Sequence, residues 1–489
     1  MKLLHVTQIG LNRGRKRIWL EFDYLEMAGF KPGQFLRVQT NAECIEIEVV
    51  NSESDSNKKV SRRGEKPLIE IPEKLIHFAE HIKKLRLAFT PNKLKITPHH
   101  SYARTASRVE RLANKVRRGE TLDLMTLFSG GEVFGSAAHE GLESASIPSR
   151  IAVCVEKETK FLKSSLANNQ HLFDSESVLI NAKIEDLDLN ALGKPIDAAI
   201  VSIPCTGASI AGRTKNKLKS AEQHEGVGHL FHYTLNWLAK VNTPLIMFEC
   251  VPQYRNTASM EVIRGVLCDD GYTLVETVQN GQDFGAIENR SRMIAIAFSN
   301  ELLGCFGGFA DEIKSYYSEV KQCVGDILED IEVNSARWKP FTYLIEKEKR
   351  DIENGKGFRR AIALRNSSKV PVIGFDYAKC RSNEPFVLLD EAEYEGLSRI
   401  FTSKEHAALK TIPNRIIAGL SETVAHQVLG QSGIYTKIRS VFEWLGSNIT
   451  KPAQRICAWV TLTLSAHCEI EKGCLHSRVK ANGRDQKTR

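Results

Sequence analysis

The feature that most constrains this chain is an alternation of strand-like and helix-like segments between residues 121 and 300. Short apolar runs rich in β-branched residues alternate there with segments whose apolar residues recur at helical spacing. Buried strands joined by helices are typical of a parallel sheet covered by helices on both faces. We therefore predict an α/β domain with a doubly wound, mostly parallel sheet. The predicted strands are residues 122–128, 151–155, 177–180, 198–201, 244–248, 273–279 and 293–298, and the predicted helices include 133–139, 230–241 and 259–268.

Polar residues follow several of these strands, and the carboxyl ends of parallel strands meet at one edge of a sheet. Ser129-Gly130-Gly131 separates the first strand from a helix, an arrangement that lets backbone N–H groups approach a ligand closely. Glu156 ends the next strand, where a dinucleotide-type fold places a carboxylate on ribose hydroxyls. A surface acid at a strand end is an equally ordinary interpretation of Glu156.

The strand at 198–201 leads into Ser202-Ile203-Pro204-Cys205 and a turn of small residues. Pro204 makes this turn rigid and Gly207 keeps its wall low, so the Cys205 thiol could face a cleft, although a lone cysteine after a strand is often inert core. Glu249 ends the strand at 244–248, and a carboxylate there is unfavourable unless it has a partner or a task.

Taken together, these features resemble the DNA cytosine-5 methyltransferases, in the order and at about the spacing of that family. The resemblance covers roughly residues 121–446 and indicates a divergent bacterial or phage type. It is carried by Phe128-Ser129-Gly130, Glu156, Pro204-Cys205 with Ser209, Glu249 with Val251-Pro252, and the pair Arg290 and Arg292 after Gly285. Downstream, Arg399 to Thr402 with Glu405, Leu409 and Pro413 resembles the segment after the target-recognition region, and Gly430-Gln431-Ser432 resembles the last catalytic motif.

The resemblance implies a Rossmann-like methyltransferase sheet that methylates cytosine C5 in DNA. Cytosine C5 is a weak nucleophile, so the Cys205 thiolate would first add to C6 of a base flipped out of the duplex. Glu249, with a pKa raised by burial, would act at N3. Arg290 would hold the cytosine O2 and Arg292 would brace the Cys205 loop.

The implied methyl donor is S-adenosylmethionine. Phe128 would pack on its adenosyl part, Gly130 would admit it closely, and Glu156 would bind its ribose hydroxyls. Asp186 is the candidate near the adenine amino group, with Glu185 as the alternative, while the family's usual acid aligns closer to Lys183. The residues assigned to the cofactor site are Phe128, Ser129, Gly130, Glu156, Asp186 and Pro204.

Several positions depart from the family pattern. Thr126, Glu132 and Val133 stand where the family carries an acid and two glycines, and Glu132 could crowd or repel the methionine carboxylate of the donor. Milder departures are Thr206, Cys250, Glu288 and Gln431 in place of glutamine, asparagine, glutamine and asparagine. We expect an active enzyme. The alternatives are a tRNA or RNA cytosine-5 methyltransferase, against which the long recognition region argues, and an inactive DNA-binding regulator.

Residues 1 to about 100 are predicted to form a β-rich module, with a hairpin-like pair at 17–22 and 35–39 and another strand at 46–50. The basic runs 13–17 and 58–63 could contact nucleic acid, but charge runs of this size are usually solvated turns. Residues 101–119 are predicted to form an amphipathic helix whose basic face lines a phosphate backbone or is solvated. The predicted divisions are 1–118 for this module and its helix, 119–300 for the cofactor-binding catalytic domain, 301–395 for target recognition, 396–446 for the return to the catalytic domain, and 447–489 for a tail.

Target recognition is assigned to about residues 302–392, where aromatic and basic residues suit contacts to phosphates and base edges. The residues singled out are Trp338, the basic glycine loop 355–360, Tyr377, Lys379 and Arg381. In the tail, His467, Cys468, Cys474 and His476 fit no common zinc spacing, so no metal site is predicted, and residues 480–489 are expected to be a disordered basic end.

The net charge of +8 in 489 residues permits a polyanionic partner without requiring one. Eleven scattered cysteines, odd in number, indicate a reducing compartment, and neither an apolar leader nor a membrane span is evident. We therefore expect a cytoplasmic monomer without a membrane partner. The resemblance implies double-stranded DNA as substrate and a cognate restriction endonuclease as a candidate partner, in restriction-modification or phage DNA protection.

Overall fold

The computed structural model describes residues 2–79, 82–189, 194–306, 308–317, 322–389 and 396–450. The chain forms two compact units, Met1–Ser107 and Arg108–Arg489. The division falls inside helix α2 (His100–Arg118), eleven residues before the boundary predicted at residue 118. Residues 451–489 of the predicted tail, with His467, Cys468, Cys474 and His476, lie outside the described residues.

The first unit is rich in β-structure, as predicted. A six-stranded sheet has the order β1-β9-β10-β5-β4-β6, and a four-stranded sheet has the order β2-β3-β8-β7. Apolar side chains from both sheets, among them Ile18, Leu36, Ile47 and Phe89, form one buried core. The strands are β1 (Leu3–Gln8), β2 (Gly10–Asn12), β3 (Arg15–Leu20), β4 (Phe35–Thr40), β5 (Ile45–Val50), β6 (Lys58–Lys59), β7 (Ser61–Arg63), β8 (Lys66–Pro72), β9 (Lys84–Thr90) and β10 (Lys93–Pro98).

The hairpin predicted between residues 17–22 and 35–39 is wrong. β3 pairs with β2 and β8, whereas β4 pairs with β5 and β6 in the other sheet. The short helix α1 (Asp23–Met27) lies in the connection between them. A tight turn is what brings two consecutive strands together, and this connection does not provide one.

The second unit contains the predicted doubly wound sheet. Its strand order is β13-β12-β11-β14-β15-β17-β16, and of these seven strands only β17 runs antiparallel to the others. The connection from β16 to β17 holds only a 3-10 turn at Gly281–Phe284, and strands joined without a crossover helix pair antiparallel. The strands are β11 (Leu122–Leu127), β12 (Ser149–Val155), β13 (Val178–Ile180), β14 (Ala198–Val201), β15 (Leu245–Cys250), β16 (Tyr272–Asn280) and β17 (Ser291–Ser299).

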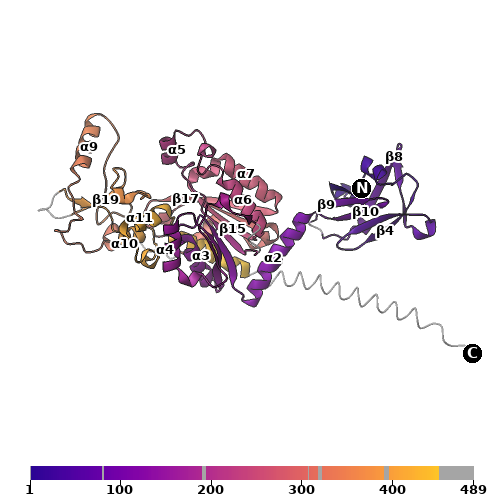
Figure 1. Ribbon diagram of the computed structural model, residues 1–489, viewed down its shortest axis with the longest axis horizontal. Helices are drawn as coiled ribbons and strands as arrows, with labels where there is room; N and C mark the ends of the chain where they lie inside the picture. The colour runs from indigo at the N-terminus through magenta and orange to yellow at the C-terminus, as the bar shows by residue number, and fades with distance from the viewer. Residues whose placement is uncertain are drawn as a thin grey trace, which may run out of the picture. The chain divides into compact units, whose positions relative to one another are not determined.

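Helices cover both faces of this sheet (Figure 1). On one face, Leu124 and Ile200 pack in a core with α3 (Val133–Ser144) and the helix at 435–450. On the other face, Met125 and Val201 pack with α6 (Leu230–Val241) and α7 (Ala258–Asp269). Adjacent residues of one strand thus belong to two cores, which explains why these strands are continuously apolar.

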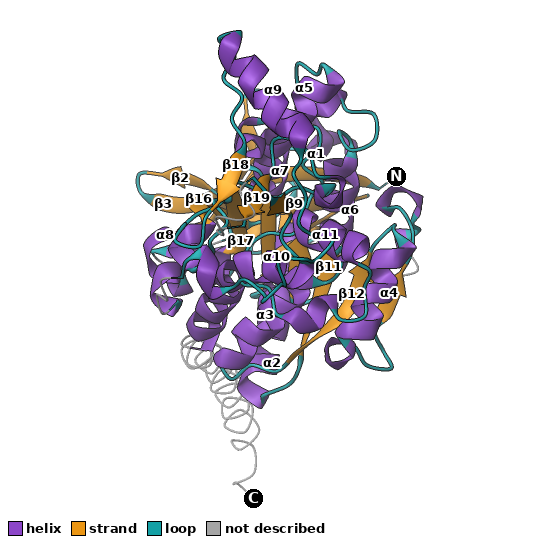
Figure 2. Ribbon diagram, turned by 90° about the vertical axis from the view of Figure 1, so that its left-hand side faces the viewer, coloured by secondary structure: helices purple, strands orange, loops and turns teal. Residues whose placement is uncertain are grey.

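Residues 301–395 include a small separate layer, the predicted recognition region. Its sheet has the order β18-β19-β20, formed by Ala361–Ala363, Pro385–Leu388 and Ser398–Arg399, and it is accompanied by α9 (Thr342–Glu353) (Figure 2). A core that includes Val324, Ile373, Tyr377 and Phe401 holds it together. The chain then returns to the core of the seven-stranded sheet through α10 (Ser403–Leu409) and α11 (Glu422–Gln431).

Three cations of α2, Arg108, Arg111 and Lys115, are bound to the second unit, whereas Arg104, Arg117 and Arg118 are exposed. Arg108 is 1% exposed, and its guanidinium donates to Ser299 Oγ and to the carbonyls of Asp270 and Gly271. Lys115 Nζ lies 2.8 Å from Asp123 Oδ2 and 2.6 Å from Asp197 Oδ2.

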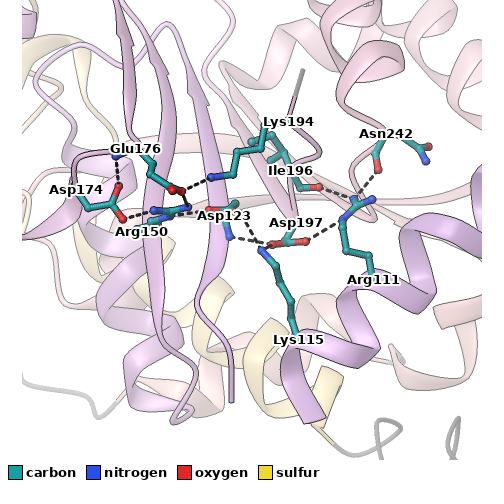
Figure 3. Close-up of polar contacts among 10 residues, drawn as sticks. All are labelled: Arg111, Lys115, Asp123, Arg150, Asp174, Glu176, Lys194, Ile196, Asp197 and Asn242. Carbon is teal, nitrogen blue, oxygen red and sulfur yellow. Dashed lines mark hydrogen bonds and ion pairs between the residues drawn. The ribbon is translucent and has the colours of Figure 1, made fainter. Parts of the chain in front are cut away.

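Figure 3 shows this network at the amino-terminal edge of the sheet. Arg111 donates to Asp197 and to the carbonyls of Ile196 and Asn242, and Arg150 reaches Asp123 from β12. Burial alone would raise the pKa of Asp123, but the hydrogen bonds from Lys115 and Arg150 outweigh it and lower that pKa. The cations of α2 therefore fasten the helix to the sheet.

Candidate active site

The loop after β11 is held in a fixed conformation by its own backbone groups. Phe128, Gly130 and Glu132 have left-handed φ angles of 60°, 57° and 60°. The Gly130 N–H donates to Glu156 Oε2 at 2.8 Å, and the Gly130 carbonyl accepts from Ser165 Oγ at 3.2 Å. Such conformations disfavour side chains and persist only where the surroundings enforce them. The loop is therefore preorganised as a shallow cradle.

Glu156 connects this loop to the end of β12. Its two carboxylate oxygens accept the backbone N–H groups of Gly130 and Glu158, each at 2.8 Å. Burial raises the pKa of Glu156, and the two backbone hydrogen bonds oppose that rise. The carboxylate retains acceptor capacity, since each oxygen has two lone pairs.

Glu132 does not crowd the loop as expected. Its side chain is fully buried beneath the loop, where Oε2 accepts from Thr126 Oγ1 at 3.1 Å and Cys154 Sγ at 3.2 Å. Burial raises the pKa of this carboxyl to about 7. Glu132 is therefore part of the support of the loop, pointing away from the cavity that the loop borders.

The Cys205 loop follows β14 as predicted. The Cys205 carbonyl accepts the N–H groups of Ala208 and Ser209 at 3.0 and 2.8 Å, and Ser209 Oγ caps the following helix α5 (Ile210–Asn216). A Cβ on Gly207 would lie 2.5 Å from the Ala221 carbonyl, so only glycine fits there. Cys205 is partly exposed and borders the large cavity, unlike the inert core cysteine considered as an alternative.

Three charged residues at the end of β15 and around the start of β17 line the same cavity: Glu249, Arg290 and Arg292. Arg292 Nε lies 3.3 Å from Glu249 Oε1, and Lys437 Nζ donates to the Arg292 carbonyl at 3.0 Å. Arg290 is 4% exposed and donates to the Gly430 carbonyl at 3.2 Å. Arg292 was expected to brace the Cys205 loop, but the ion pair found for it joins Glu249.

Behind Arg290 lies a buried ion network. Glu288 Oε1 accepts from Arg290 Nη1 at 3.4 Å and from the Ile373 N–H at 2.8 Å, while Oε2 lies 2.5 Å from Lys410 Nζ. Both Glu288 and Lys410 are fully buried. The network thus ties Arg290 to Ile373 in the predicted recognition region.

These elements enclose one cavity of about 1040 Å³. All the predicted catalytic and cofactor residues line it except Asp186. In that segment, Lys183 and Glu185 line the cavity. The sequence also did not single out Lys160, Phe375 and His229, which line the cavity from loops and helices that carry no motif. The predicted residues that line it are Phe128, Ser129, Gly130, Glu156, Pro204, Cys205, Glu249, Arg290 and Arg292.

In the recognition region, the assignment of Tyr377 to base contacts is not supported. Tyr377 is fully buried, and its hydroxyl donates to the Pro385 carbonyl and accepts the Phe401 N–H. Lys379 and Arg381 are exposed and both pair with Asp376. Phe375 reaches the cavity, where its ring lies edge-on to Phe161 at 6.3 Å between centroids.

Comparison with known proteins identifies the family. The family model of the C-5 cytosine-specific DNA methylases matches residues 123–446, about two thirds of the chain. A predicted type II methyltransferase of Oceanobacillus iheyensis, M.OihORF3336P, is 27% identical over 121 residues, which is 24% of this chain and only 25% of that protein.

Solved structures share the fold. The Dnmt2 methyltransferase of S. pombe superposes with a TM-score of 0.51 at 20% identity, over 68% of this chain and 99% of that one. The Entamoeba histolytica methyltransferase EhMeth superposes with a TM-score of 0.51 at 17% identity, over 67% and 98%. Within the described residues, no helix is both long and apolar enough to cross a membrane.

Proposed function

Because this chain belongs to the C-5 cytosine-specific DNA methylases, we propose that it methylates cytosine C5 in duplex DNA with S-adenosylmethionine as the donor. The observation that carries the proposal is the single cavity bordered by Cys205, Glu249, Arg290 and the glycine loop. The resemblance to a predicted type II methyltransferase supports a role in restriction-modification or phage DNA protection, with a cognate endonuclease as candidate partner.

In the proposed reaction, Cys205 acts as a thiolate and forms an S–C6 bond with a cytosine flipped into the cavity. Glu249 supplies a proton or hydrogen bond at N3, which offsets the negative charge of the adduct and leaves C5 nucleophilic, as in an enamine. Arg292, paired with Glu249 at 3.3 Å, fixes the orientation of that carboxyl. C5 would then take up the methyl group that the donor supplies. Loss of the C5 proton to a base and departure of the thiolate from C6 restore the C5–C6 double bond and free Cys205.

The residues of the cavity fit the donor. Gly130 leaves room for close approach, Glu156 offers carboxylate oxygens to ribose hydroxyls, and Phe128 offers an aromatic face. Glu185 lines the cavity and Asp186 does not, which supports Glu185 as the acceptor for the adenine amino group. When bound, S-adenosylmethionine supplies an electrophilic methyl group.

The buried position of Glu132 favours an active enzyme over an inactive regulator. Crowding of the methionine carboxylate was the reason for considering the regulator, and the Glu132 side chain instead bonds Thr126 and Cys154 beneath the loop. Val133 still lines the cavity, but an apolar side chain adds no charge there.

The test is incubation with duplex DNA containing 5-fluorocytosine together with S-adenosylmethionine. Release of Cys205 requires that a base remove the hydrogen at C5 as a proton, and a fluorine at C5 cannot be removed in this way. The covalent adduct should therefore persist in denaturing electrophoresis with the native chain and be absent with Cys205→Ser. An adduct on RNA alone would transfer the proposal to an RNA substrate, and DNA binding without any adduct would favour the regulator. Glu156→Ala should weaken donor binding measured by calorimetry, and an unchanged affinity would remove Glu156 from the site.

A further inference from the structure

The positive charge of this chain is concentrated outside the catalytic part. Residues 1–107 contain 19 lysines and arginines against 12 acidic residues, whereas residues 108–450 contain 40 against 44. A part of a protein that binds the phosphate backbone through charge is expected to carry a clustered excess of cations. The first unit has this excess, and the described catalytic part has none overall.

One face of the six-stranded sheet gathers much of this charge. In β9, Leu85, Leu87 and Phe89 point into the core, while Lys84 and Arg86 point to solvent. Strand pairing places Ala88 opposite Lys95, Lys93 opposite Glu48, and Glu48 opposite Arg37 on that same outer face. We call Arg37, Lys84, Arg86, Lys93 and Lys95 the basic sheet face.

The acids on this face do not neutralise it. Three of its five cations are ion-paired: Lys95 with Glu46 at 2.7 Å, Lys93 with Glu48 at 2.8 Å and Arg37 with Asp55 at 3.9 Å. For Lys84 and Arg86, no ion pair is found among the residues that the structure describes. Val6 lies opposite Arg86 on the edge strand β1 and is 44% exposed, so the two free cations border an open apolar edge.

We propose that the basic sheet face binds the backbone of duplex DNA without sequence preference, as a second contact in addition to that made by the catalytic cavity. The proposal rests on the proposed function only for the choice of duplex DNA as the polyanion. Lys84 and Arg86 are two residues apart on one strand, so their side chains emerge about 7 Å apart on one side and can reach neighbouring phosphates.

A second contact tethered to the catalytic unit would mainly lengthen the time that the protein stays on DNA and speed its search for target sites. Binding through one part of a chain raises the local concentration of DNA for the other part. A contact made only with phosphates lets a protein slide and hop along DNA and is strongly weakened by salt. Arg108, Arg111 and Lys115 of α2 do not provide this contact, because they are bound to the second unit itself.

The test compares full-length proteins carrying Cys205→Ser, so that no chemistry intervenes. Binding of a labelled 30-base-pair duplex is followed by fluorescence anisotropy at several salt concentrations. Lys84→Gln with Arg86→Gln should weaken binding about tenfold at low salt and reduce the slope of log K against log[salt] by about 2, roughly 1 for each lost phosphate contact. The matched control is Lys31→Gln with Lys74→Gln, which removes the same charge from exposed positions off this face and should change the slope little.

An unchanged slope in the Lys84/Arg86 variant, or an equal loss in the control, would overturn the proposal. Loss of binding to vesicles of phosphatidylcholine and phosphatidylserine with an unchanged DNA isotherm would also overturn it, because the face would then serve a membrane surface. If the 5-fluorocytosine adduct never forms on DNA but the Lys84/Arg86 variant still loses duplex binding, the proposed function fails and the DNA-binding face stands.

Discussion

At the scale of single residues, two departures from the family pattern compensate for each other. The family carries an acid where this chain has Thr126 and a glycine where it has Glu132. The Glu132 carboxylate accepts a hydrogen bond from Thr126 Oγ1 at 3.1 Å, so a carboxylate still occupies the space beneath the loop. The acid has moved from the strand to the loop, and this could not be predicted from two positions judged separately.

The buried Glu132 carboxyl predicts a pH dependence of stability. Its pKa is about 7 in the folded chain, against 4.5 for an ordinary glutamate, so the folded state holds a proton that the unfolded state releases. This stabilisation is complete below pH 4.5 and is lost as the pH rises to 7. Glu132→Gln cannot ionise, so it does not lose this stability. Between pH 4.5 and pH 7, its free energy of unfolding should therefore rise relative to that of the native chain by up to about 3 kcal/mol.

Urea denaturation at a series of pH values measures the difference. The exposed Glu120→Gln is the control and should track the native chain throughout. A constant difference between Glu132→Gln and the native chain would show that Glu132 is ionised, or accessible to water, in the folded protein.

The ion pair of Glu288 and Lys410 makes a second residue-scale prediction. Glu288 stands where the family has glutamine, and both side chains are fully buried, with Oε2 and Nζ 2.5 Å apart. Removing one partner of such a pair leaves an uncompensated charge and typically destabilises by about 3–5 kcal/mol. Glu288→Gln and Lys410→Gln should each lower the free energy of unfolding by this amount. The double variant should recover most of the lost stability, because the two amides can form a hydrogen bond.

A double-mutant cycle in chemical denaturation measures this coupling. The cycle should be accompanied by methyl transfer assays, since Glu288 also contacts Arg290 and the Ile373 N–H. If the losses in free energy of unfolding of the two single variants simply add in the double variant, the Glu288 and Lys410 side chains do not stabilise each other.

At the scale of elements, the sequence predicted each strand of the catalytic sheet, because a buried parallel strand leaves a continuous apolar run. Residues 198–201 and 230–241 coincide with β14 and α6 as observed. Strand partners in the first unit were not predictable in the same way, since alternation of polar and apolar residues gives the face of a strand but not its neighbour. Phe375 and Lys160 were missed because they reach the cavity only through the tertiary fold.

The helix α2 shows why a basic face can mislead. Its amphipathic pattern was correctly predicted, but the partners of its cations were not. Asp123 lies in the next strand, β11, and Asp197 lies 82 residues beyond Lys115. Lys115→Met should destabilise the second unit by about 3 kcal/mol, because it leaves two buried carboxylates without this partner. The exposed Arg117→Met on the same helix should change the free energy of unfolding by less than about 0.5 kcal/mol.

Denaturation curves for these two variants, with the DNA-binding salt slope as a second measurement, separate the roles. Lys115→Met should leave the salt slope unchanged, since the ammonium group is bound to Asp197 at 2.6 Å. A reduced slope without loss of stability would restore the phosphate-lining role for α2.

At the scale of the whole molecule, the two units have separate cores and separate charges. The core of the first unit includes Ile18, Leu36 and Phe89, and the cores of the second unit are built around the seven-stranded sheet. Units with their own cores can unfold in separate transitions. The division of charge suggests a division of work, with general DNA affinity in the first unit and chemistry in the second.

This organisation predicts the response to the methyl donor. Scanning calorimetry of the full chain should show two transitions, and S-adenosylmethionine at 100 times its Kd should stabilise only the second unit, by about 2.7 kcal/mol. For a unit of this size, that corresponds to a rise of about 4 °C in the midpoint of one transition. Glu156→Ala should abolish the shift without moving the other transition, because Glu156 borders the cavity within the second unit. A single transition that moves as a whole would mean that the two units unfold together, and the first unit would then stabilise the donor site as well as add DNA affinity.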